Sequence, residues 1–144
     1  MIEDLFQNRL LISALLAWAA AQLIKFCIYA VVNHSLDLQR LFGDGGMPSG
    51  HSATVTALAT TAAIQYGMDS AAFAVSLILA IIVMHDAMGV RRQAGKHAKA
   101  INEMMAMFYS DIAPEKKLQE FLGHTPLQVL FGALLGLVVG LILQ

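Results

Sequence analysis

Two histidines stand at the starts of apolar segments, where this residue type is uncommon. His51 belongs to "GGMPSGHSAT", and His124 belongs to "GHTPLQ". In the first stretch Ser49 can cap a helix and Gly50 lets a ligand approach the backbone, so free amides and the helix dipole can hold an anion there. Histidine can exchange a proton near neutral pH or attack phosphorus directly. The two stretches predict phosphoryl chemistry, and plain helix caps beside interfacial histidines are the structural alternative.

The residues after His124 have a structural explanation of their own. Thr125 suits an N-cap, Pro126 suits the first helical position, and Gln128 stands where a capping box has Glu or Gln. This motif does not need a histidine before it. We therefore interpret His124 as a functional residue that the helix start positions.

A basic stretch, "HDAMGVRRQAGKHAK", follows the third apolar segment. Arginine forks match phosphate oxygens, so Arg91, Arg92 and Lys96 are candidates for a phosphate clamp. Asp86 ends an apolar helix, where a carboxylate is costly unless it is paired or functional. The alternative is a basic segment that only touches anionic lipid headgroups, and this is the better interpretation of Lys99.

A further cation, Lys25, lies inside the first apolar segment, one turn after Gln22. A lysine within a membrane helix is a functional candidate by default. We expect a phosphate group or the carboxylate of Asp86 to be its partner.

Composition indicates where these residues must be placed. The chain has 144 residues, of which 58% are hydrophobic and 13% charged, and its mean hydropathy is +0.65. Soluble domains carry about 25% charged residues, so the sequence indicates one integral membrane domain over residues 1–144. The net charge of −1 and the lack of nucleic-acid motifs argue against a nucleic-acid partner. The lone Cys27 excludes an internal disulfide and a cysteine-rich metal site.

Four apolar segments predict an all-α, integral membrane four-helix bundle. No stretch alternates with a period of two, which argues against a barrel, and the acidic start "MIEDLFQNR" does not resemble a cleavable signal. The predicted helices cover about 10–32, 51–67, 70–88 and 126–143, with a polar helical connection over about 91–122.

Counting membrane crossings brings the polar stretches together. If the first helix ends on one side, the second starts there with "GGMPSGHS", the third returns with "HDAMGVRR", and the fourth starts there with "GHTPLQ". This side is predicted to be cytoplasmic because the basic residues gather on it, while Arg9 lies opposite. The basic residues expected there are Arg40, Arg91, Arg92, Lys96, Lys99, Lys116 and Lys117.

Small residues recur every four positions in the last segment, at Gly132, Gly136 and Gly140. Such stripes let membrane helices approach closely. The glycines are expected either to pack within the bundle or to form a homodimer interface.

Three stretches in this order, "GGMPSGHSA", "HDAMGVRR-x-x-GK" and "LGHTPLQVLFGALLG", resemble the divergent branch of the type 2 phosphatidic acid phosphatase family. That family is related to acid phosphatases and vanadium-dependent haloperoxidases, and the resemblance runs from "QLIK" to the glycine-rich last helix. It implies that His51 protonates the leaving group and that His124 attacks phosphorus. It also implies that Ser49 and Gly50 line the phosphate pocket.

The sequence departs from the superfamily pattern at three places. Val32, Leu118 and Gln128 stand at the positions of two arginines and of the acid that orients the nucleophile. Gln128 or Asp86 would then hold His124. The residues expected to supply the missing cations are Lys25, Arg91, Arg92 and Lys96.

The expected function is hydrolysis of a lipid phosphomonoester or diphosphate through a phospho-His124 intermediate, without metal or cofactor. The expected partners are the phosphorylated lipid and the surrounding lipids of a bacterial plasma membrane. One alternative is a binding or transport protein that kept the anion pocket, which Gln128 favours. A metal-dependent hydrolase using Asp86, His85, His51 or His124 is another, although no spacing here matches a known ligand pattern. A purely structural membrane protein is the last.

Overall fold

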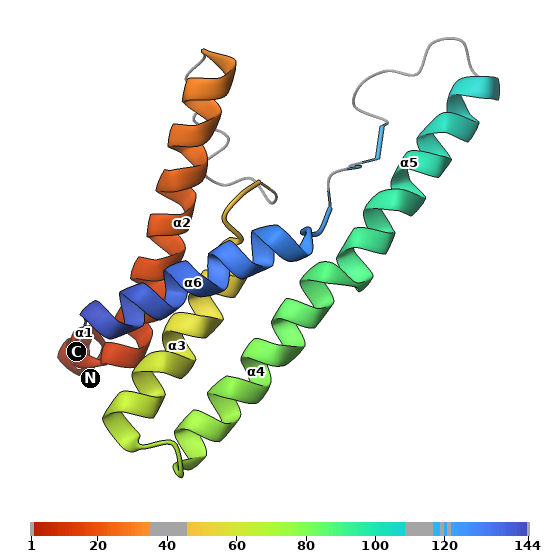
Figure 1. Ribbon diagram of the computed structural model, residues 1–144. Helices are drawn as coiled ribbons and strands as arrows, with labels where there is room; N and C mark the ends of the chain where they lie inside the picture. The colour runs from red at the N-terminus through yellow and green to blue at the C-terminus, as the bar shows by residue number, and fades with distance from the viewer. Residues whose placement is uncertain (1, 35–45, 109–116, 119, 121, 144) are drawn as a thin grey trace.

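The structure, a computed structural model, describes residues 2–34, 46–108, 117, 118, 120 and 122–143, and most of these residues are helical. No strand occurs among these residues, which confirms the all-helical fold class. The helices, shown in Figure 1, are α1 (Ile2–Gln7), α2 (Arg9–Asn33), α3 (Gly50–Tyr66), α4 (Ala71–Met88), α5 (Val90–Phe108) and α6 (Pro126–Ile142).

Local capping chemistry determines where the helices begin. Asn8 accepts a hydrogen bond from the amide of Leu11 at 3.1 Å and so starts α2. Between α3 and α4, Gly67 ends one helix with φ of 87°, and Ser70 caps the next by accepting from the Phe73 amide at 3.2 Å. A glycine suits this turn because L side chains rarely adopt a positive φ.

Helix α3 lies at the centre and packs against α2, α4 and α6 (Figure 1). Its contact with α2 consists of small residues, with Ala17 and Ala21 fully buried against Ala53 and Ala57. One buried polar pair crosses the same interface, where the Thr61 hydroxyl donates to Ser13 Oγ at 2.9 Å. Small residues and hydroxyl bonds replace the hydrophobic driving force that lipid cannot supply.

Large apolar side chains point outward instead of inward. On α4, Val75, Ile78 and Ile82 are 69%, 56% and 60% exposed. Two helical stretches, Arg9–Asn33 and Ala71–Phe108, are long and apolar enough to cross a membrane, and α6 is a shorter apolar helix. An apolar exterior around a core of alanine and serine fits a protein surrounded by lipid.

Helix α5 continues α4 nearly in line beyond Gly89 (Figure 1). Of the helical connection expected over 91–122, α5 covers the part up to Phe108, and residues 109–116, 119 and 121 lie outside the described residues. Leu118, Glu120 and Leu122 are not helical. The side chain of Asn102 explains this, because it bonds both the N–H and the C=O of Leu118 at 2.9 Å. Those are the groups that Leu118 would use within a helix.

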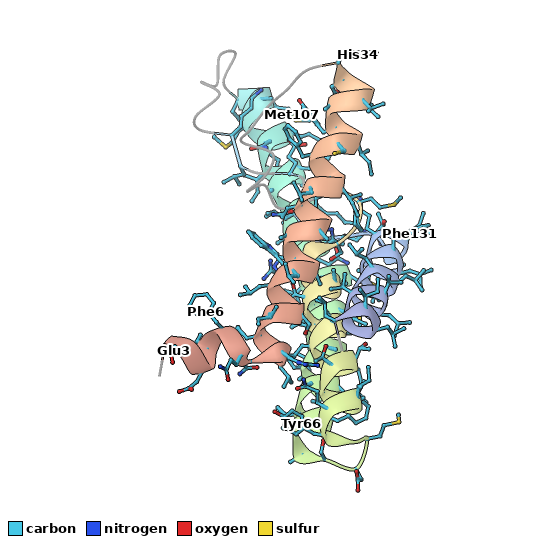
Figure 2. All side chains as sticks on the ribbon, turned by 90° about the vertical axis from the view of Figure 1, so that its left-hand side faces the viewer. Glu3, Phe6, His34, Tyr66, Met107 and Phe131 are labelled. Carbon is cyan, nitrogen blue, oxygen red and sulfur yellow. The ribbon has the colours of Figure 1, made fainter. Side chains whose placement is uncertain are left out.

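The two longest helices reach the same end of the molecule. His34 and Met107 lie there, whereas Tyr66 lies at the opposite end (Figure 2). Helix α3 begins beside the middle of α2, because Gly50 lies against Trp18 and Lys25. The start of α3 is therefore recessed from the end of α2, at the level of Lys25.

The glycine stripe of α6 is filled by α3 of the same chain. A Cβ on Gly132 would collide with the Ser49 carbonyl, one on Gly136 with the Ala53 carbonyl, and one on Gly140 with Thr60. All three glycines are buried. The stripe expected as either a bundle contact or a homodimer interface is a bundle contact, and we do not propose a dimer through it.

Candidate active site

Main-chain hydrogen bonds join the three polar stretches. The Ser49 amide donates to the Gln128 carbonyl at 3.0 Å, which ties the start of α3 to the first turn of α6. The His124 amide donates to the Ala87 carbonyl at 2.9 Å, which ties the start of α6 to the end of α4. The structure therefore brings together the stretches that the crossing count placed on one side.

The two histidine rings lie close together at this junction. The ring centroids of His51 and His124 are 6.2 Å apart, and the ring planes are tilted by 57°. His51 is half-buried, whereas His124 is 4% exposed.

At the start of α3, the helix N-terminus and the ammonium group of Lys25 lie side by side. Ser49 caps the helix by accepting from the Ser52 amide at 3.3 Å, and its hydroxyl also bonds the Ser52 hydroxyl at 3.0 Å. A Cβ on Gly50 would lie 3.7 Å from Lys25 Nζ and 3.6 Å from Trp18 Cδ1. The ammonium of Lys25 thus lies beside the helix N-terminus, where an anion would be held.

Trp18 is a neighbour of the site that the sequence analysis did not identify. It precedes Gln22 and Lys25 at helical spacing, so the three residues share one stripe of α2. The helical spacing of Trp18 to Gln22 and Lys25 is the signal by which the sequence could have identified it.

The start of α6 is closed by its own side chains. The Thr125 hydroxyl accepts from the Gln128 amide at 3.3 Å, and Gln128 Oε1 accepts from the Thr125 amide at 2.9 Å, which is the expected capping box. Gln128 Oε1 also lies 3.4 Å from His124 Nδ1. An amide oxygen only accepts, so this contact favours the tautomer with a proton on Nδ1 and a lone pair on Nε2.

A pocket of about 370 Å³ opens beside His124, between α5 and the start of α6. Arg92 and Lys96 line it, as do Thr125 and Gln128. Lys99, which the sequence assigned to lipid headgroups, lines the same pocket.

Arg91 and Asp86 form an ion pair instead of facing His124 together. Arg91 Nε lies 2.9 Å from Asp86 Oδ2, and both side chains are about half exposed. Arg91 is absent from the described lining of the pocket. Of the two residues expected to hold His124, Gln128 is the one within hydrogen-bond distance of its ring.

Asn102 positions the segment that leads to His124, and the sequence analysis did not identify it. Besides its two bonds to Leu118, its amide donates to Glu120 Oε1 at 2.9 Å. The segment also packs on bare backbone, since a Cβ on Gly95 would meet the Glu120 carbonyl and one on Gly123 would collide with Arg92. The mark of this role is that Asn102, on a polar helix, is only 8% exposed. That exposure is known from the structure and not from the sequence.

Among the described residues, no group of three or more His, Cys, Asp or Glu side chains is arranged to hold a metal ion.

Comparison with known proteins identifies the family of this chain. The family model of the Divergent PAP2 family matches residues 6–139. The chain is 43% identical over 152 residues to the uncharacterized membrane protein YuiD of Bacillus subtilis (strain 168), covering 97% of this chain and 96% of that protein. No solved structure matches the chain. The chain is a membrane protein that belongs to the Divergent PAP2 family.

Proposed function

We propose that the protein is a metal-independent phosphatase of lipid phosphates, with His124 as nucleophile and His51 as general acid and base. The observation that carries this proposal is the pair of histidine rings 6.2 Å apart, between an N-terminal turn with a lysine and a pocket with cations. Family membership supports it at the level of phosphatase-related chemistry.

The reaction takes two steps. Nε2 of His124 attacks phosphorus while the bond from phosphorus to the leaving oxygen breaks, and the proton of the His51 imidazolium passes to that oxygen. Water then attacks the phospho-His124 intermediate as His51 takes up a proton from it, and inorganic phosphate leaves. Neither step uses a metal or a cofactor.

The phosphoryl oxygens would contact donors on both sides of the histidines. Ser49 and Gly50 offer the N-terminus of α3, with Lys25 beside it, and Arg92 and Lys96 face the pocket from α5. Charge on a transferring phosphoryl group is stabilised best by donors that are already in place. Arg91 would act indirectly, through its ion pair with Asp86 at the base of α5.

An apolar groove supports a lipid as the substrate. It holds about 320 Å³ between α2 and α6, and its walls include Ile24 and Ile28 of α2, Pro48, and Phe131 of α6. Pro48 directly precedes Ser49, so the groove begins next to the phosphate turn. A hydrocarbon tail in this groove would place its headgroup at the histidine pair.

We also propose the membrane arrangement. Helices α2, α3, α4 and α6 would form a four-helix membrane bundle in a bacterial plasma membrane, with α5 extending from it. The site would face the cytoplasm, as the excess of basic residues near it suggests.

The test is phosphate release by the purified protein from phosphatidate, phosphatidylglycerophosphate and polyprenyl phosphates. His124→Ala and His51→Ala should each lower kcat at least a thousandfold while the thermal unfolding temperature stays close to that of the wild type. His97→Ala is the matched control, because His97 is exposed on α5 and does not line the pocket. Vanadate should inhibit, since it adopts the geometry of the transition state. Full activity of His124→Ala would overturn the mechanism.

A second candidate rests on Gln128. A glutamine oxygen stabilises an imidazolium less than a carboxylate does, which favours a protein that binds or transports a phosphorylated lipid without hydrolysing it. Saturable binding of phosphatidate with no phosphate release from any of the substrates would favour this candidate.

A further inference from the structure

The cations near the histidine pair belong to two separate groups. Lys25 comes from α2 and lies beside Gly50 at the start of α3. Arg92, Lys96 and Lys99 come from α5, at spacings of four and three residues, and face the pocket beside His124. One phosphoryl group in contact with both His51 and His124 would lie at the boundary of these groups.

The α5 group covers more space than one phosphoryl group needs. From Arg92 to Lys99 the helix rises about 10 Å. The pocket of about 370 Å³ has the volume of about a dozen water molecules, each occupying roughly 30 Å³. A transferring phosphoryl group brings one phosphorus and three oxygens, so most of the pocket lies beyond it.

The charge of this pocket also exceeds what a balanced protein surface would carry. Among the described residues, three cations and the carboxylate of Glu120 line it, and the charges of these side chains sum to +2 (3 − 1). Glu120 is held in place by Asn102 at 2.9 Å. Lys99 is 3.8 Å from Glu103, but both side chains are over 60% exposed, and exposed pairs of this kind contribute little.

We propose that the substrate carries two neighbouring phosphoryl groups. The terminal group is transferred to His124 beside Gly50 and Lys25, and the second group is held by Arg92 and Lys96 and remains on the leaving group. This inference rests on the proposed function, because it specifies which lipid phosphate the same site selects. Two kinds of lipid have this chemistry, a lipid diphosphate and a headgroup with a phosphodiester beside a terminal phosphomonoester.

The two kinds differ in where charge develops. In a diphosphate, the bond from the terminal phosphorus to the bridging oxygen breaks, and that oxygen leaves on the second phosphoryl group and takes the proton of His51. The charge that develops before this proton transfer spreads over the second phosphoryl group, so the α5 cations stabilise it in the transition state. Removing one of them then lowers kcat. In the phosphodiester case the leaving oxygen is a headgroup hydroxyl that takes the proton of His51, and the second phosphoryl group keeps its charge throughout. Removing a cation then raises KM and leaves kcat close to the wild-type value.

The test compares three lipids with identical acyl chains: phosphatidate, diacylglycerol diphosphate and phosphatidylglycerophosphate. The wild-type protein should prefer at least one of the two-phosphoryl lipids over phosphatidate by tenfold or more in kcat/KM. Lys96→Gln and Arg92→Gln should each reduce this preference by on the order of ten- to a hundredfold, the usual effect of losing one charged hydrogen bond. Lys117→Gln removes an exposed lysine outside the pocket and should leave the preference unchanged.

Two results would overturn the proposal. One is an equal loss on all three lipids in Lys96→Gln, which would mean that the α5 cations hold the transferred group itself. The other is no preference in the wild type together with weaker binding of Lys96→Gln to vesicles of phosphatidylglycerol, which would assign these cations to membrane headgroups.

A binding measurement separates this proposal from the proposed function. Lipid analogues with a methylenediphosphonate or a single phosphonate headgroup cannot be hydrolysed, so their binding does not depend on catalysis. Tighter binding of the diphosphonate that Lys96→Gln abolishes would support the two-phosphoryl site even if the wild type hydrolyses none of the three lipids. Equal binding of the two analogues would overturn it even if the wild type is an active phosphatase.

Discussion

The starts of α3 and α6 touch each other through the bond from the Ser49 amide to the Gln128 carbonyl, yet they are built differently. The start of α3 has a small cap, a glycine and a lysine beside it. The start of α6 has a complete capping box, in which side chains bond both the Thr125 and the Gln128 amides. Of the two histidines, the one at α3 is half-buried and the one at α6 is almost fully buried.

This difference separates two tasks that one helix terminus cannot perform at once. Amides that are bonded to a capping box are not available to an anion, so the α6 terminus orients a histidine instead of binding phosphate. The α3 terminus has the Lys25 ammonium beside its buried Gly50. In the proposed mechanism, the site places a rigid nucleophile next to an anion cradle formed by the α3 terminus and Lys25.

Among the changes that test this comparison, we expect the largest effect from Asn102→Leu, which releases the α6 terminus from α5. Asn102→Leu leaves the N–H and C=O of Leu118 without their partner, which should cost about 1 to 3 kcal/mol of stability. Because the segment holds His124, kcat should fall tenfold or more while KM and vanadate binding at the α3 terminus change little. Asn102→Asp keeps the acceptor for the Leu118 amide and should recover part of kcat.

The matched control is Gln93→Leu, an exposed amide on the same helix. Steady-state kinetics and thermal unfolding of the three variants would decide the matter. If Asn102→Leu is destabilised but keeps the wild-type kcat, the contacts of His124 with α4 and α6 hold it without help from α5.

Changes at Gln128 should have a smaller effect. They separate its role in the helix cap from its contact with His124. Gln128→Ala removes the acceptor for both Thr125 and His124, and we expect about 1 kcal/mol of lost stability and a several-fold lower kcat. Gln128→Glu keeps the acceptor and adds a negative charge beside the imidazole. A carboxylate stabilises the imidazolium, so the acidic limb of the pH–rate profile should move to higher pH with kcat at or above the wild-type value. An unchanged profile in Gln128→Glu would argue that this side chain serves the helix cap alone.

The smallest effect on kcat should come from the two caps themselves. Thr125→Ala and Ser49→Ala each remove one cap, and each should cost about 0.5 to 2 kcal/mol in thermal or denaturant unfolding. Ser49→Ala should lower kcat/KM more than Thr125→Ala does, because its hydroxyl belongs to the turn that receives the phosphoryl group. Equal losses of kcat/KM in the two variants would contradict the division of tasks.

Local motifs allowed much of the site to be predicted. The caps at Ser49 and Thr125 follow from residue types next to apolar segments, and the structure has both. The convergence of His51 and His124 followed from counting crossings, which needs helix number and no packing detail. Those features depend on short stretches of chain or on topology.

Contacts between distant segments could not be predicted. The pairing of Arg91 with Asp86 depends on how α5 leaves α4, and the bonds from Asn102 to Leu118 join residues sixteen positions apart. The glycine stripe has the same spacing whether its partner is α3 or a second copy, so its partner was left open. Each of these depends on the relative placement of two elements, which residue periodicity does not contain.

The glycine contact between α3 and α6 also bears on how the protein is made. These two helices are separated along the chain by α4 and α5, so in the proposed membrane bundle α3 would enter the membrane well before α6 is synthesised. Until α6 arrives, the Ser49, Ala53 and Ala57 backbone that it covers would face lipid or the insertion machinery. A ribosome stalled before Pro126 would therefore hold an anion cradle without a nucleophile, and the active centre would be completed at a late step of biogenesis.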